Sequence, residues 1–134
     1  MRSPRTFAVA LVVAFLALSG VVFAHHSRAH YANEELTTKG TVVEYKWRNP
    51  HVFVVWAVKD QTGNTKQWVG EMASLTSMIA EGMTKDSLKM GDEIAVIAFP
   101  SKIAGSTEAL VKKITKADGT VVIDNSRSPN LRAP

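Results

Sequence analysis

Apolar and polar residues alternate along most of the chain, and this pattern predicts a small β-rich domain. In the first strand, Val43, Tyr45 and Trp47 are expected to share one face. Val42 is expected on the other face. Residues 51–59 are apolar on both faces, which indicates a strand that is buried or belongs to a closed barrel. The strands are expected at residues 36–47, 51–59, 65–72, 93–99, 107–116 and 120–123.

One short helix is expected between the third and fourth strands. Ser74 can cap its first turn, and Gly82 suits the position just after its end. Leu75, Met78 and Ile79 follow the i, i+3, i+4 spacing of a single helix face. The spacing predicts that these three side chains share one face of the helix, and core filling is expected of Met78.

The resulting order, β-β-β-α-β-β, is typical of the OB-fold, a small Greek-key barrel. The expected fold class is therefore all-β, an OB-fold-like barrel with one short helix, following an N-terminal signal helix. A closed barrel also leaves no unpaired edge on such apolar strands. An open five-stranded sandwich or half-barrel is the alternative.

The first residues have the pattern of a secretory signal peptide. Arg2 and Arg5 precede an unbroken apolar run at 7–18, and Ser19-Gly20 interrupts that run before Ala24. We expect cleavage after Ala24 and a periplasmic or secreted protein. The alternative is an uncleaved membrane anchor, because residues 7–24 are long enough to span a bilayer.

This pattern divides the chain into four segments. They are a signal peptide at 1–24, an exposed N-terminal arm at 25–35, the barrel domain at 36–123 and a disordered tail at 124–134. Removal of Arg2 and Arg5 lowers the formal net charge from +4 to +2, since 14 Lys and Arg remain against 12 Asp and Glu. No basic block is left, so nucleic acid is not an expected partner, and neither is the membrane after cleavage. The chain has no cysteine, which excludes a disulfide framework and a thiolate site.

Four histidines are the only candidate chemistry, because no catalytic motif is present and an enzyme is not expected. After cleavage, His25 would carry both a free α-amine and an imidazole, which together can chelate one metal ion. A third nitrogen from His51 would complete a site that suits copper. His26 or His30 can add a further ligand. The histidines therefore predict a copper-binding or carrier protein.

Other interpretations of these residues are open. Histidines on an arm are often only polar surface. Softer donors for cuprous ion are available in Met72, Met78, Met83 and Met90, with Trp47 nearby. A different function is a non-enzymatic binding module, in which an aromatic barrel face holds an oligosaccharide, a peptide or an envelope partner. That face would consist of Tyr45, Trp47 and Phe53.

Several segments resemble a family of small exported bacterial proteins of unknown function. They are Ala24-His25-His26-Ser27, Gly40-Thr41-Val42, Trp47-Arg48-Asn49-Pro50-His51-Val52 and residues 84–92. The resemblance covers nearly the whole mature chain and implies an exported single domain with the strand order above. It implies no activity. The chain departs from that family at Met83, where tryptophan is frequent, and at 30–33, which replace a more acidic run. In size and architecture alone, it is similar to periplasmic OB-fold copper chaperones.

Overall fold

The computed structural model describes residues 28–127. The chain divides into a first unit, residues 1–30, and a second unit, residues 31–134. The expected signal peptide, His25, His26 and residues 128–134 lie outside the described part of the chain. Within residues 28–127, no helix has both the length and the apolar composition needed to cross a bilayer.

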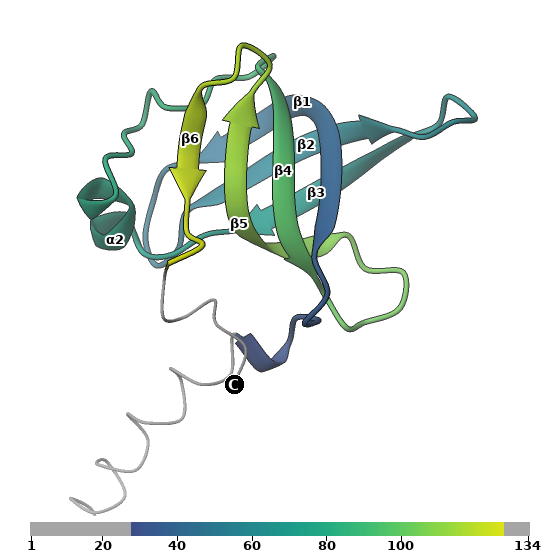
Figure 1. The fold of residues 1–134 in the computed structure, drawn as a ribbon, viewed down its shortest axis with the longest axis horizontal. Helices are drawn as coiled ribbons and strands as arrows, with labels where there is room; N and C mark the ends of the chain where they lie inside the picture. The colour runs from purple at the N-terminus through teal and green to yellow at the C-terminus, as the bar shows by residue number, and fades with distance from the viewer. Residues whose placement is uncertain (1–27, 128–134) are drawn as a thin grey trace, which may run out of the picture. The chain divides into compact units, whose positions relative to one another are not determined.

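The second unit contains a closed five-stranded barrel and confirms the expected OB-fold-like class (Figure 1). Its sheet has the order β3-β2-β1-β4-β5-β6, and a parallel pairing of β3 with β5 closes the ring. β6 pairs with β5 outside the ring. The elements are β1 (Leu36–Lys46), β2 (Phe53–Lys59), β3 (Thr65–Glu71), α2 (Leu75–Ala80), β4 (Glu93–Pro100), β5 (Glu108–Lys116) and β6 (Val121–Asp124).

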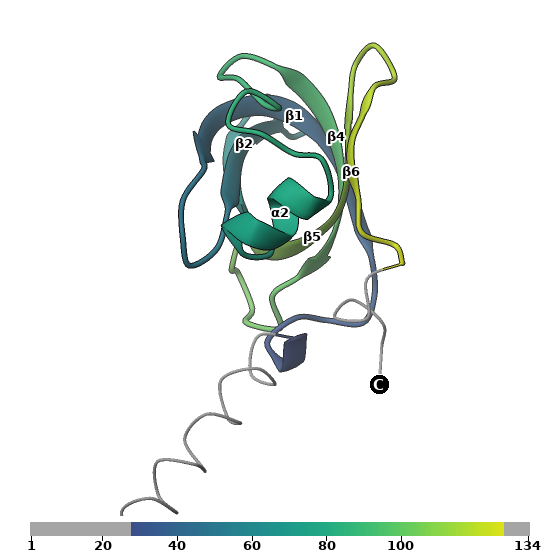
Figure 2. The ribbon, with the colours of Figure 1, turned by 90° about the vertical axis from the view of Figure 1, so that its left-hand side faces the viewer.

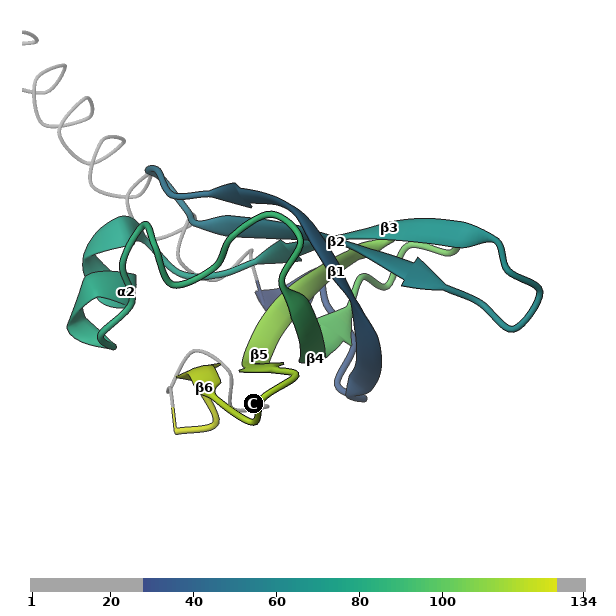
Figure 3. The same cartoon turned by 90° about the horizontal axis from the view of Figure 1, so that it is seen from above.

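The short helix α2 lies across one end of the barrel (Figure 2). The β2–β3 hairpin extends from the opposite end (Figure 3). Ser74 caps α2 as expected, since its side chain accepts a hydrogen bond from the N–H of Ser77 at 3.3 Å. Met78 is buried as expected and Leu75 packs against the core, but Ile79 is 57% exposed, so the face that the three residues were expected to share is not buried as a whole. One helical step from Met78 turns Ile79 away from the barrel.

β1 contains one extra residue, and this bulge changes which side chains face the core. Val42 and Glu44 pair with consecutive residues of β2, so Val43 is left without a partner there. Val42 is buried, and Tyr45 also packs against the core. The expectation that Val42 and Tyr45 face opposite ways is therefore wrong, because an inserted residue reverses the alternation of the strand.

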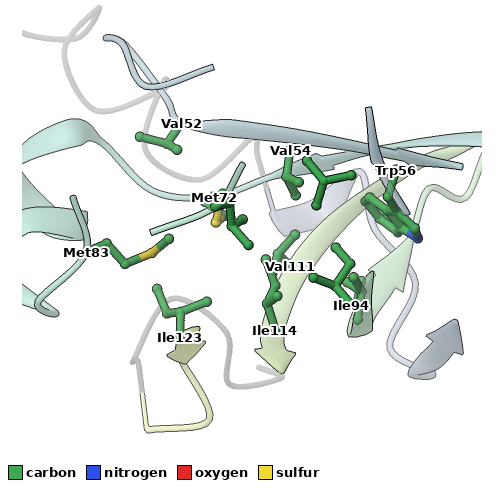
Figure 4. Packing of buried hydrophobic residues seen from close by; sticks show 14 of the residues in the cluster. Val52, Val54, Trp56, Met72, Met83, Ile94, Val111, Ile114 and Ile123 are labelled. Carbon is green, nitrogen blue, oxygen red and sulfur yellow. The ribbon is translucent and has the colours of Figure 1, made fainter. Parts of the chain in front are cut away.

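The core fills the barrel with aliphatic, methionine and tryptophan side chains (Figure 4). Trp56 is buried and stacks on Trp68 with ring centroids 6.2 Å apart. The indole N–H of Trp56 donates to Oγ1 of Thr38 at 3.0 Å, so its one polar atom is satisfied. Trp47 is partly buried against the same cluster. The three tryptophans therefore contribute to packing, as the sequence predicts.

Two residues are more buried than the expected segment boundaries imply. Tyr31, in the segment expected to be an exposed arm, is 6% exposed. Asp124 belongs to β6, and the buried Asn125 donates its N–H to the carbonyl of Lys112 at 2.8 Å. The packed domain therefore starts before Leu36 and continues past Ile123.

We expect Gly40→Ala to destabilise the barrel by about 1–3 kcal/mol. A Cβ at this position would lie 2.2 Å from the carbonyl oxygen of Ala57, so the backbones of β1 and β2 would have to separate. Urea denaturation measures the change. Lys39→Ala, at an exposed position of the same strand, is the control and should alter the free energy of unfolding by less than about 0.5 kcal/mol. Equal stability of the two variants would contradict this account of Gly40.

Candidate functional site

His51 lies on the outer surface, just before β2 begins. It follows the cis peptide bond Asn49–Pro50. The next residue, Val52, is buried and extends the pairing with the end of β3: its N–H donates to Ala73 at 3.0 Å and its carbonyl accepts from Met72 at 2.9 Å. Because successive side chains of an extended segment point to opposite faces, the imidazole of His51 points outward. Its side chain is 40% exposed.

Glu71 holds the His51 ring from the neighbouring strand. It ends β3 and pairs with Phe53 of β2, which alternates with the buried Val54, so Glu71 also lies on the outer surface. Its Oε1 accepts a hydrogen bond from Nδ1 of His51. The Glu71 side chain is 18% exposed, which shields this contact from much of the solvent.

Tyr31 completes the arrangement from the start of the second unit. Its hydroxyl donates to Oε2 of Glu71 at 2.6 Å. Burial raises the pKa of Tyr31, and the hydrogen bond to Glu71 and the charges of Glu71 and Glu108 raise it further. The hydroxyl therefore stays protonated and acts as a donor. We call His51, Glu71 and Tyr31 the His51 cluster.

The His51 cluster selects one tautomer of the imidazole. An ionised carboxylate only accepts hydrogen bonds, so the proton of neutral His51 is on Nδ1 and the lone pair is on Nε2. Within residues 28–127, Nε2 makes no hydrogen bond. A carboxylate bound to one nitrogen of a histidine is the usual support for metal ligation by the other nitrogen. The cluster can therefore present one oriented nitrogen ligand to solvent.

The other three predicted histidines all precede the second unit in the sequence. His30 is exposed and belongs to the first unit, while His25 and His26 precede the described residues. Among residues 28–127, no three His, Cys, Asp or Glu side chains form a group that could hold a metal ion. Any complete coordination sphere at His51 thus needs ligands from other parts of the chain or from solvent.

The methionines, which are the alternative donors for cuprous ion, lie mostly in the core. Met72, Met78 and Met83 are buried in the core cluster, and Figure 4 shows Met72 and Met83 among its aliphatic side chains. Met90 is exposed and is not part of that cluster. The flexible methionine side chains fill the core at the end of the barrel where α2 packs, which is a common use of this residue.

The expected aromatic binding face is also divided. Tyr45 pairs with the buried Val54 and faces the core, whereas Phe53 pairs with Lys46 and faces outward. The Tyr45 and Trp47 rings lie 5.8 Å apart and pack against the core. The Tyr45 hydroxyl donates to a backbone carbonyl at 3.2 Å. Tyr45 and Phe53 therefore lie on opposite sides of the sheet and do not form one surface.

Sequence reasoning identified His51 but missed Glu71 and Tyr31. A prediction of the strand register between β2 and β3 would have paired Glu71 with Phe53. That pairing places Glu71 beside His51. No local pattern marks Tyr31, because it stands in a polar segment and its partner lies 40 residues away.

One solved structure to which the chain is similar is that of the mitochondrial single-stranded DNA binding protein Rim1 of S. cerevisiae. The two share 13% sequence identity with a TM-score of 0.49, over 63% of this chain and 92% of that chain. No curated protein sequence matches the chain. Residues 13–111 match the model of a family of unknown function, DUF6152, which agrees with the resemblance seen in the sequence. The chain belongs to the DUF6152 family of unknown function.

Proposed function

We propose that this protein is an exported copper-binding carrier whose ion is held by His51 together with histidines of the N-terminal segment. The hydrogen bond between Glu71 and Nδ1 of His51 carries the proposal. It directs the lone pair of Nε2 outward and increases the basicity of the imidazole, and both effects favour metal ligation. The signal-like residues 1–24 support export.

The other ligands would come from the residues just before Tyr31. His30 is its immediate neighbour, and His25 lies six positions upstream, a span of at most about 20 Å in an extended chain. With cleavage after Ala24, His25 supplies an amine and an imidazole to the same ion. A set of nitrogen donors suits Cu(II) better than Cu(I).

The charges around the His51 cluster also favour a cation. Glu71 lies beside His51, and Glu108 is close enough to Tyr31 to raise its pKa. Both acidic residues lie near the β3–β5 pairing, where Glu108 pairs with Val69 and Glu71 with Leu110. Negative charge at this place attracts cations and offsets part of the charge of a bound ion.

His51→Ala should weaken Cu(II) binding by about tenfold or more, roughly 1.4 kcal/mol, because it removes the only ligand supplied by the barrel. Calorimetric titration of protein with an authentic His25 terminus, confirmed by intact mass, measures the affinity. Gln67→Ala, at an exposed position of β3, is the control and should bind like the wild type. Identical affinities of the two variants would exclude His51 as a ligand.

Zn(II) is titrated in parallel, since imidazole also suits zinc. Tighter binding of Zn(II) would overturn the choice of copper.

Adding Gly-Ser ahead of His25 should reduce Cu(II) affinity by about tenfold or more, because the new terminus moves the α-amine away from the His25 imidazole. The same two residues added after Pro134 provide the control and should leave binding unchanged. If the N-terminally extended protein binds as tightly as the wild type, the α-amine is not a ligand.

Glu71→Gln should lower Cu(II) affinity by about tenfold, the usual cost of losing a carboxylate that supports a ligating histidine. The variant keeps the size of the side chain and removes its charge. Glu44→Gln is matched to it, because Glu44 lies on the same sheet and pairs with Lys46 instead of His51. A comparable loss in both variants would mean that Glu71 acts only through its general charge.

A further inference from the structure

The carboxylate of Glu71 is shared between two side chains. Oε1 accepts from Nδ1 of His51, and Oε2 accepts from the Tyr31 hydroxyl at 2.6 Å. With a partner at each oxygen, the carboxylate has one preferred orientation, and the plane of the imidazole follows from it. Tyr31 is almost fully buried and Glu71 largely so, and water therefore replaces a lost partner poorly.

The backbone at Tyr31 is fixed to a different part of the barrel. Tyr31 forms a β-bridge with Ser101, just after β4, and the N–H of Ala32 donates to the carbonyl of Pro100 at 2.8 Å. The N–H of Ser101 in turn donates to the carbonyl of Glu108 at 2.8 Å, at the start of β5. Tyr31 therefore connects the end of β4 with Glu71 at the end of β3.

We propose that Tyr31 is a positioning residue for the His51 site, and that metal binding there is coupled to the anchorage of the chain at Tyr31 through the shared carboxylate of Glu71. This inference rests on the proposed copper-binding function and adds its regulation. A cation on Nε2 polarises the imidazole, which strengthens the bond from Nδ1 to Glu71 and further restrains the carboxylate. By linkage, a restrained carboxylate also holds the Tyr31 hydroxyl more firmly, and the coupling acts equally in both directions.

Tyr31→Phe is the direct test, because it keeps the ring and the backbone pairing and removes only the hydroxyl. Tyr45→Phe is the matched control: Tyr45 is also partly buried, with a hydroxyl that donates to a backbone carbonyl away from Glu71. We expect Tyr31→Phe to weaken Cu(II) binding about fivefold and to change the EPR spectrum of the bound ion. Tyr45→Phe should change neither. In the Glu71→Gln background, Tyr31→Phe should have little further effect, because the two residues act in series.

Hydrogen exchange of the Ala32 amide tests the same coupling in the wild-type protein. This amide bonds to Pro100, so its exchange reports the anchorage at Tyr31. Saturating Cu(II) should slow its exchange about fivefold or more in the wild type and should not slow it in His51→Ala. This measurement decides the question even if Tyr31→Phe does not fold.

The outcomes separate this inference from the proposed function. Wild-type protein that binds no Cu(II) overturns both. If the wild type binds and His51→Ala weakens binding, the carrier function stands. With that function established, equal affinities of Tyr31→Phe and Tyr45→Phe overturn the coupling, and so does Ala32 exchange that ignores copper.

Discussion

The residues from Val69 to Glu71 of β3 pair in parallel with those from Glu108 to Leu110 of β5, and this pairing closes the barrel. The close approach needs a glycine at its centre. A Cβ on Gly70 would lie 2.6 Å from Cγ2 of Val111 and 2.8 Å from Cζ3 of Trp56, so any larger residue would displace core side chains. Closure also removes the free edges of five apolar strands, which would otherwise invite pairing with other chains.

Closure determines where polar chemistry can be located. The interior is filled by apolar side chains such as Met72 and Val111 (Figure 4), so the polar side chains of the strands lie toward the outside. Glu71 follows Gly70, so strand alternation turns its carboxylate outward at the end of the closing pair. His51 and Tyr31 meet at that carboxylate from the two sides of β3: His51 precedes β2, which pairs with one edge of β3, and Tyr31 is anchored near the start of β5, which pairs with the other. The same pairing that completes the core thus supplies the support for an oriented histidine on the surface.

The strands, the helix and their order were predictable from the sequence because alternation and capping are local signals. The bulge at Val43 was not predictable, because an inserted residue leaves the apolar composition of a strand almost unchanged. It changes only which side chains after the bulge face the core. Glu71 and Tyr31 were missed for a different reason. They lie 20 and 40 residues from the partners they contact, and those contacts depend on strand register. His51 was found because its residue type alone indicates possible chemistry.

The orientation of His51 depends on packing at a distance from its ring. Tyr31, Glu71 and His51 come from three separate segments of the second unit and meet at one carboxylate. Tyr31 is buried, and backbone bonds at Ser101 and Ala32 hold the chain on both sides of its side chain, so its hydroxyl has little freedom to leave Glu71. The Glu71 carboxylate is therefore held from the inside of the fold, and the imidazole that it orients lies on the surface.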